Sequence, residues 1–463
     1  MTNVRKTIFI LLVLIISPQL NAQSLLDVYE KALRFDPTIK VAEANYLAIL
    51  ELKPQAMSYF FPSLTLRTYN SRSDSKDMNP IPDYRTGSPI IGTTGIGSLR
   101  ETTSISLNLS QTIFDMRSIV GLSQTNKRLA QAEALYNYEK QNLLLRVSEA
   151  YFNVLAAKDI LIAQQTAKKA IGRQLDLARS RFELGLIAIT DVQESQAGYD
   201  LAVASEIEAE RLHSSSKEFL REITGEYIEE PSSPKNNMPL ENPTPDDIEE
   251  WVKMSLDQNL SLISSKINER IAQDSIKIQR GTRFPVITLS GNINESNTDV
   301  TRSLFCIDEN TCPVRVNSKT SPEGYNIALN VNFPIFTGGF NSSKIRQAVY
   351  EHRAAKESTE SIARQTERLT RDSFLGVITE ISKVKALTQA VESSKTALVA
   401  TEAGFEVGTR TAVDVLVSQN SLAQAETNLA RSKYDYILNI LKLSQSVGSL
   451  SIDDLNKVNE WLD

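Results

Sequence analysis

The stretch Tyr325-Asn326-Ile327-Ala328-Leu329-Asn330-Val331-Asn332-Phe333 places apolar side chains at odd positions and Asn or Ala at even positions. Such an alternation predicts a β-strand with one apolar face and one polar face. Residues 104–110 repeat it with Ile105, Leu107 and Leu109, and residues 64–66 and 287–290 repeat it more briefly. Four strands are therefore expected, two short ones within about 61–113 and two within about 284–335.

Two kinds of surroundings produce this alternation. An antiparallel sheet that covers a globular core is one of them. Here the polar faces carry uncharged Asn and Ser, and no compensating globular core follows in the sequence, which favours lipid on one face and water on the other. Four strands are too few to close a barrel, since about eight are needed. Several chains must then pool their strands, because an open sheet edge is not tolerated in lipid.

The chain is a tandem duplication. Phe61-Pro62 recurs as Phe284-Pro285, and Gly185 and Asp191 recur as Gly408 and Asp414, each 223 positions later. We expect a first repeat over 23–225 and a second over 248–448. A linker over 226–247, which contains five prolines, separates them, and a tail over 449–463 follows.

Each repeat ends in a long segment without proline. We expect long helices at about 118–184 and 341–407, followed by return helices at about 191–224 and 414–447. In the first long helix, apolar residues recur every seven positions from Leu122 to Ala150, as in a coiled-coil seam. A second stripe, which includes Leu144 and Val154, faces another way, so this helix packs on both flanks. Shorter helices at 25–35 and 248–259 open the two repeats.

Composition excludes several classes of function. The 463 residues carry a net charge of −6 without a basic block, which is unsuited to nucleic acid. Residues 1–22 place Arg5 and Lys6 before a short apolar run, as in a secretory signal peptide. Two cysteines, Cys306 and Cys312, predict a small disulfide-closed loop in an oxidising compartment, with two free thiols as the alternative.

No residue pattern indicates catalysis. The two histidines, His213 and His352, are not paired at a spacing that binds metal, and no nucleophile or phosphate-binding motif occurs. Thr337-Gly338-Gly339 is explained by a tight turn. We therefore expect no catalytic residue, no metal site and no cofactor.

Several motifs resemble those of the TolC family of outer-membrane export channels. They are Gln111-Thr112-Ile113-Phe114-Asp115, Phe333-Pro334-Ile335-Phe336-Thr337-Gly338-Gly339, Ala150-Tyr151-Phe152-Asn153-Val154-Leu155, 185–193 and 408–416. The resemblance covers essentially the whole chain after residue 22.

The resemblance implies an α+β membrane protein that forms a homotrimer. Four strands from each chain make a 12-stranded outer-membrane β-barrel, continued by a 12-helix periplasmic α-barrel. The short helices and the proline-rich linker form an equatorial mixed domain. The implied partners are a periplasmic adaptor (a membrane fusion protein), an inner-membrane RND or ABC-type pump and outer-membrane lipid. The implied function is efflux of drugs and detergents and type I protein secretion.

The resemblance also implies roles for the helix tips. Arg410 would tie to Thr190 and Asp191 of neighbouring helices and so latch the periplasmic mouth. Phe405 stands where the family has a Tyr of that latch. Asp414 would form an acidic ring at the entrance, but Val417 stands where a second Asp is expected. Gly185, Leu186, Gly408 and Thr409 would contact the adaptor. Plain capping of a helix N-terminus is the alternative role for Asp191 and Asp414.

A periplasmic coiled-coil adaptor or scaffold is the main competing function, because it also contains long helical hairpins. The four alternating strands and the duplication argue against it. A secreted enzyme is a remote third possibility, since no active site is found.

Overall fold

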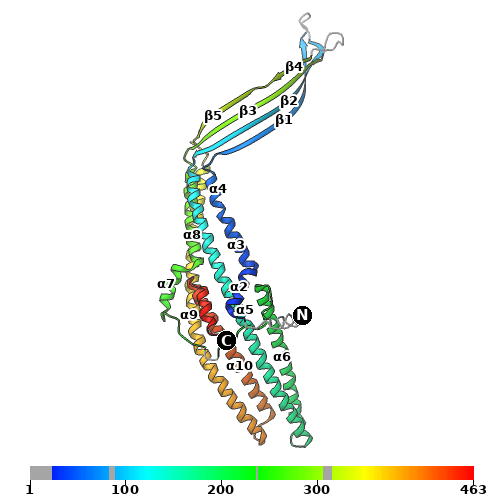
Figure 1. The fold of residues 1–463 in the computed structure, drawn as a ribbon, viewed down its shortest axis with the longest axis vertical. Coiled ribbons are helices and arrows are strands. Elements are labelled where there is room, and N and C mark those ends of the chain that lie inside the picture. The colour runs from blue at the N-terminus through cyan, green and yellow to red at the C-terminus, as the bar shows by residue number, and fades with distance from the viewer. Residues whose placement is uncertain (1–22, 83–88, 236–237, 306–314, 463) are drawn as a thin grey trace, which may run out of the picture. The chain divides into compact units, whose positions relative to one another are not determined.

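The protein is described by a computed structural model that covers residues 23–82, 89–235, 238–305 and 315–462 (Figure 1). It divides into two compact units. The first unit comprises Met1–Ala48, Ala130–Ile267 and Lys356–Asp463, and the second comprises Ile49–Leu129 and Asn268–Ala355. Each unit takes residues from both repeats, so the repeats are not the structural units. The predicted signal peptide at 1–22 and the predicted Cys306–Cys312 loop lie outside the described residues.

The second unit contains an antiparallel sheet in the order β1, β2, β3, with β4 and β5 both paired to the far side of β3 (Figure 1). The strands are β1 (Ser63–Pro82), β2 (Pro89–Phe114), β3 (Val286–Phe305), β4 (Arg315–Thr320) and β5 (Glu323–Asn332).

Strands β4 and β5 are one strand path with a break. Thr298 pairs with Thr320 and Glu295 with Glu323, so the register continues without a shift across the gap. The gap contains Pro322, which has no N–H to donate to the ladder. The sheet therefore has four strand paths, as the sequence predicted.

The strands are longer than the prediction of short strands allowed, and that prediction was wrong. β1 covers 20 residues and β2 covers 26. From Asn70 to Lys76 both faces of β1 are polar, so the sequence there has no apolar alternation although the hydrogen-bonded ladder continues.

Two long helices and two return helices follow the strands. The long helices are α5 (Met116–Glu183) and α9 (Phe340–Glu406), against the predicted 118–184 and 341–407. The return helices are α6 (Ile189–Thr224) and α10 (Ala412–Val447), against 191–224 and 414–447. The remaining helices are α2 (Leu25–Phe35), α3 (Pro37–Leu50), α4 (Leu52–Ser58), α7 (Ile248–Gln258), α8 (Leu260–Gly281) and α11 (Ile452–Asn459).

In the second unit, polar contacts join α5 to α8. The Gln124 amide donates to the Ile271 carbonyl and to Ser275 Oγ, both at 2.9 Å. Asp274 is buried and pairs with Lys127 and with Lys277. Burial alone would raise the Asp274 pKa, but the hydrogen bonds from the two ammonium groups outweigh it and hold that pKa below its usual value.

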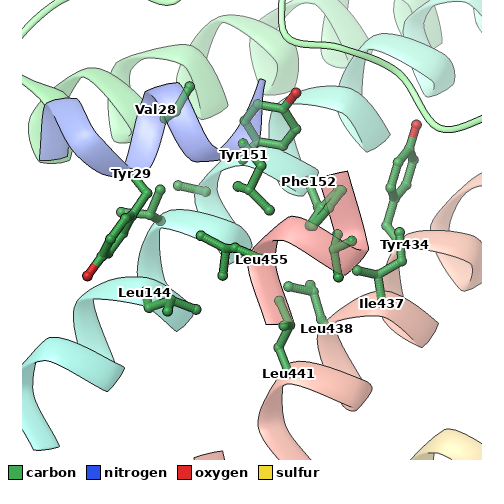
Figure 2. Close-up of a cluster of buried hydrophobic side chains, with 14 of the residues drawn as sticks. Val28, Tyr29, Leu144, Tyr151, Phe152, Tyr434, Ile437, Leu438, Leu441 and Leu455 are labelled. Carbon is green, nitrogen blue, oxygen red and sulfur yellow. The ribbon is translucent and has the colours of Figure 1, made fainter. Parts of the chain in front are cut away.

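The core of the first unit gathers side chains from several helices, among them α2, α5, α10 and α11 (Figure 2). Tyr151 and Phe152 of α5 meet edge to face, with ring centroids 5.4 Å apart, and Phe152 also contacts Tyr434 of α10. Val28 from α2 and Leu455 from α11 belong to the same cluster. The stripe predicted around Leu144 and Val154 is buried here as well. The helices of the two repeats thus share one core.

The proline-rich linker is attached to this core by the ends of the chain. Tyr151 Oη donates to the carbonyls of Gln23 and Ser232, each at 3.0 Å. Gln23 forms a β-bridge with Pro231, and Pro234 forms one with Leu462. The linker, Gln23 and Leu462 are therefore all attached to the same helical core.

Two glycines allow the packing to be tested directly. Gly448 has a φ of +87°, and a Cβ added to it would lie 2.5 Å from the Gln258 carbonyl oxygen. Gly408 has a φ of +80° with open space around it. Gly408→Ala should cost about 1–2 kcal/mol because of backbone strain alone. Gly448→Ala should lower the thermal unfolding midpoint more than Gly408→Ala does, as measured by circular dichroism in detergent. Equal midpoints would contradict the packing of Gly448 against α7.

Candidate gate and wall residues

The two helical hairpins turn at equivalent glycines. Gly185 has a φ of +72° and Gly408 a φ of +80°, a left-handed conformation that favours glycine. The Leu186 N–H donates to the Arg181 carbonyl at 2.9 Å, and the Thr409 N–H donates to the Gly404 carbonyl at 2.8 Å. Both turns thus end the preceding helix by the same backbone bonds.

Apolar side chains are exposed at these turns. Leu184 and Leu186 are 74% and 69% exposed in the first turn, and Val407 is 76% exposed in the second. The expected adaptor-contact residues Gly185, Leu186, Gly408 and Thr409 therefore lie at two exposed turns that carry large apolar groups.

Asp414 caps the N-terminus of α10. Its carboxylate accepts hydrogen bonds from the Thr411 N–H at 2.9 Å and from Thr411 Oγ1 at 3.0 Å. Thr411 Oγ1 in turn accepts from the Asp414 N–H at 3.3 Å, which completes a capping box. These bonds, chiefly the backbone one, and the nearby Arg410 charge lower the Asp414 pKa. The capping alternative is thus correct for Asp414 within a single chain.

Asp191 occupies the equivalent position in α6, but its cap is incomplete. The residue before the helix is Ala188, which has no hydroxyl group where α10 has Thr411. Within the described part of the chain, the Asp191 carboxylate forms no hydrogen bond or ion pair. Both repeats therefore carry the acid, but only the second repeat has a hydroxyl group that completes the cap.

The side chains of Arg410 and Thr190 likewise lack bonding partners among the described residues. Both side chains are exposed, and among the described residues neither forms a side-chain hydrogen bond or an ion pair. The chain therefore does not join Arg410 to Thr190 or Asp191 internally. Gly404 determines how closely Arg410 approaches the end of α9, since a Cβ added to Gly404 would lie 2.8 Å from Arg410 Cγ.

Phe405 lies inside its own hairpin. It is buried and packs with Ala412, Val415 and Leu398. Arg181 of α5 covers its ring at 4.5 Å and donates to its carbonyl at 3.0 Å, a cation–π contact that joins the two hairpin ends. Sequence reasoning missed Arg181. The only signal was that Arg181 stands where the second repeat has Gly404.

The sheet of the second unit has one apolar face. Cross-strand pairing places Leu66, Leu107, Ile293 and Tyr325 in one row, and Leu64, Leu109, Gly291 and Ile327 in the next. Tyr325 is 81% and Ile327 is 72% exposed, although such side chains are rarely so exposed over a contiguous area in water. This apolar face therefore requires a covering.

The other face of the sheet is polar. Thr65, Asn108, Asn292 and Asn326 form one of its rows. Asn292 donates to Asn108 at 2.6 Å, and Asn330 donates to Ser290 at 2.9 Å. Arg67, directly beside Leu66, points to this face, so the face that carries it is suited to water. The sheet thus presents one face suited to an apolar medium and one suited to water.

The described residues contain no group of three or more His, Cys, Asp or Glu side chains that could hold a metal ion. Nor does any helix among them have both the length and the hydropathy to cross a membrane.

Comparison with known proteins identifies the family to which this combination of sheet and helices belongs. The model of the outer membrane efflux protein family matches residues 28–226 and again residues 251–449. The chain belongs to the outer membrane efflux protein family. The two matches are offset by the same interval as the repeated motifs, which confirms the duplication.

Individual relatives agree with the family. The chain is 34% identical to outer membrane protein TolC of Vibrio cholerae over 95% of this chain and 94% of that protein. It is 26% identical to the alkaline protease secretion protein AprF of Pseudomonas aeruginosa over 94% and 87%. The crystal structure of VceC from Vibrio cholerae matches with a TM-score of 0.71 and 19% identity, covering 92% of this chain and 96% of VceC.

Family membership settles the class of this outer membrane efflux protein. It confirms the resemblance to TolC, the outer-membrane location and the non-enzymatic class. The fold of long helices with four strand paths per chain is confirmed by the likeness to VceC.

Proposed function

We propose that three copies of this chain pool their strands into one outer-membrane barrel and export solutes through it. The observation that carries the proposal is the sheet with an apolar and a polar face and two free edges. Among the described residues, β1 pairs only with β2, and β4 and β5 pair only with β3. Backbone groups on such edges would remain unsatisfied in lipid, and copies of the same chain supply the missing partners.

The polar face supports a water-filled lumen. Arg67 lies at the level of the apolar rows, and an arginine directed into the middle of a bilayer costs about 2–4 kcal/mol. The hydrogen-bonded Asn and Ser residues beside it are uncharged. With the apolar face toward lipid, every one of these groups faces water.

A latch between chains is proposed for the periplasmic end. The Arg410 side chain forms no hydrogen bond or ion pair among the described residues, and neither do those of Thr190 and Asp191, so each is available to a neighbouring copy. An arginine–carboxylate bond is charge-assisted and stronger than a neutral hydrogen bond. Phe405 contributes by supporting Arg181 and the hairpin end rather than through a hydroxyl group.

An acidic entrance is proposed at Asp414. Three copies of this carboxylate would raise the local negative potential and attract cations. Val417, one helical turn further along α10, is 59% exposed and adds no second ring. The capping box is compatible with this role, because an acceptor-only carboxylate retains free lone pairs.

The proposed partners are a periplasmic adaptor and an inner-membrane RND or ABC-type pump. The adaptor would meet the exposed turns at Gly185-Leu186 and Gly408-Thr409. The AprF relative, whose name concerns protease secretion, supports protein export beside efflux of drugs and detergents. A deletion strain tested against toxic compounds and assayed for secreted proteins would separate these cargoes.

The assembly predicts the mass of the extracted protein. Membranes solubilised in mild detergent should release a particle with the mass of about three chains, measured by light scattering with the detergent contribution subtracted. The free strand edges are the physical reason. A stable membrane-inserted monomer would contradict the proposal, and release by sonication without detergent would favour the scaffold alternative.

The latch predicts the effect of Arg410→Glu. Like charges at 410 and 191 would repel each other, so single-channel conductance in planar bilayers should rise several-fold, as expected when a charge-assisted bond is lost and replaced by repulsion. Arg364→Glu is the matched control, because Arg364 is exposed on α9 and pairs within its own helix. If correctly assembled R410E trimers conduct like R364E trimers, the latch is wrong.

The entrance predicts block by trivalent cations. Asp414→Ala should abolish that block, and Val417→Asp should strengthen it by adding three carboxylates. Hydrogen bonds from Thr411 lower the Asp414 pKa. The carboxylate therefore stays charged within the pH range in which an ordinary Asp is protonated, and it is neutralised only as pH falls through the lowered pKa. Block should therefore persist from pH 7 to pH 5, and Thr411→Val should begin to lose it at a higher pH. Unaltered block in Asp414→Ala would leave Asp414 as a helix cap alone.

A further inference from the structure

The polar face of the sheet carries charge of only one sign. Among the side chains that the structure describes on this face, the charged ones are Arg67, Arg100 and Arg302, and none is Asp or Glu. The strand acids whose side chains the structure describes lie on the other face. Glu101 and Asp299 share a row with Arg72 and Lys319 on the apolar-face side.

The two faces also differ in how their charges are compensated. On the apolar-face side, Arg72 pairs with Glu101 at 3.2 Å and Lys319 lies 4.0 Å from Asp299. On the polar face, Arg67, Arg100 and Arg302 form no ion pair and no side-chain hydrogen bond within the described residues. Their positive charge is therefore not neutralised by the chain itself.

Arg100 and Arg302 are neighbours. Arg100 pairs with Val300, and Arg302 pairs with Ser98, so the two arginines lie diagonally across adjacent strands β2 and β3. Diagonal neighbours of this kind are about 7–8 Å apart. This is within the Debye length of about 8 Å at physiological ionic strength, so their fields overlap.

These arginines lie beyond the apolar rows. Arg100 lies in the row next to that of Arg72, Glu101, Asp299 and Lys319, and Arg302 lies two rows further along the strands. Arg67 lies nearer the start of β1, beside Leu66. The positive charge thus extends from the level of the apolar rows to the charged ends of the strands.

We propose that Arg100 and Arg302, assisted by Arg67, form an anion-binding segment of the channel lumen that takes molecules with clustered phosphate, sulfate or carboxylate groups. The proposal rests on the proposed channel, in which three copies bring these pairs around one lumen. Arginine suits this ligand class because its guanidinium group binds oxyanions with paired donors. The segment is opposite in sign to Asp414, so it favours polyvalent anions that an acidic entrance does not retain.

The test uses inorganic tripolyphosphate as the probe on the full-length channel in planar bilayers at 0.1 M KCl, added to each side in turn. Wild type should be blocked from one side. In the Arg100→Ser/Arg302→Ser variant the blocking concentration should rise by about 10-fold, because converging charges raise the local concentration of an opposite ion by that order. The block should largely disappear at 1 M KCl, where the Debye length falls to about 3 Å.

Matched variants separate lumen charge from general effects. Arg72→Ser removes the same charge from the opposite face of β1 and should leave block unchanged. Arg100→Lys/Arg302→Lys keeps the charge and should retain most of the block. Conducting channels in which the double serine variant is blocked like wild type would overturn this inference while leaving the channel standing. Wild-type protein that never conducts would overturn both.

Discussion

An unpaired backbone group in hydrocarbon has no water to bond, and this constraint governs the rest of the structure. The sheet satisfies it internally from β1 to β5 but leaves two free edges. A further strand from the same chain is not supplied by the described residues. In the proposed barrel the chain inserts its apolar face together with other copies, so that assembly would be a condition of membrane insertion rather than an addition to it.

Duplication supplies two similar hairpins, and small departures from symmetry give them different chemistry. Thr411 completes the cap of Asp414, whereas Ala188 offers the Asp191 carboxylate no hydroxyl group, and that carboxylate has no hydrogen-bond partner among the described residues. Arg181 covers the Phe405 ring, whereas its counterpart Gly404 makes room for Arg410. The glycine turns themselves remain equivalent. The backbone of the duplicated unit is thus retained, while single side chains at its ends decide which groups are free to bind a neighbouring chain.

The sequence predicted the features that depend on local pattern. Proline-free segments and glycines located the ends of α5, α6, α9 and α10 to within a few residues, because helix termination is a local property. The extent of the strands could not be predicted, since both faces of β1 from Asn70 to Lys76 are polar and only cross-strand hydrogen bonds reveal the ladder. Arg181 was missed for a similar reason. Its contact with Phe405 joins residues far apart in the chain, and an arginine near a helix end looks like any solvated charge.

The charges of Asp414 and of the arginines on the polar face of the sheet act over short distances. Salt screens charges beyond about 8 Å, so the acidic Asp414 position and the arginines of the polar face of the sheet each act on what passes close by. In the proposed channel, a small ion that passes away from the wall stays outside that range, whereas an extended polyvalent molecule presents several charged groups to the wall at once. The uncharged Asn and Ser residues beside Arg67 on the same face offer hydrogen bonds without trapping either sign. Local charge on an otherwise neutral wall therefore distinguishes cargo by the spacing of its charged groups more than by its net charge.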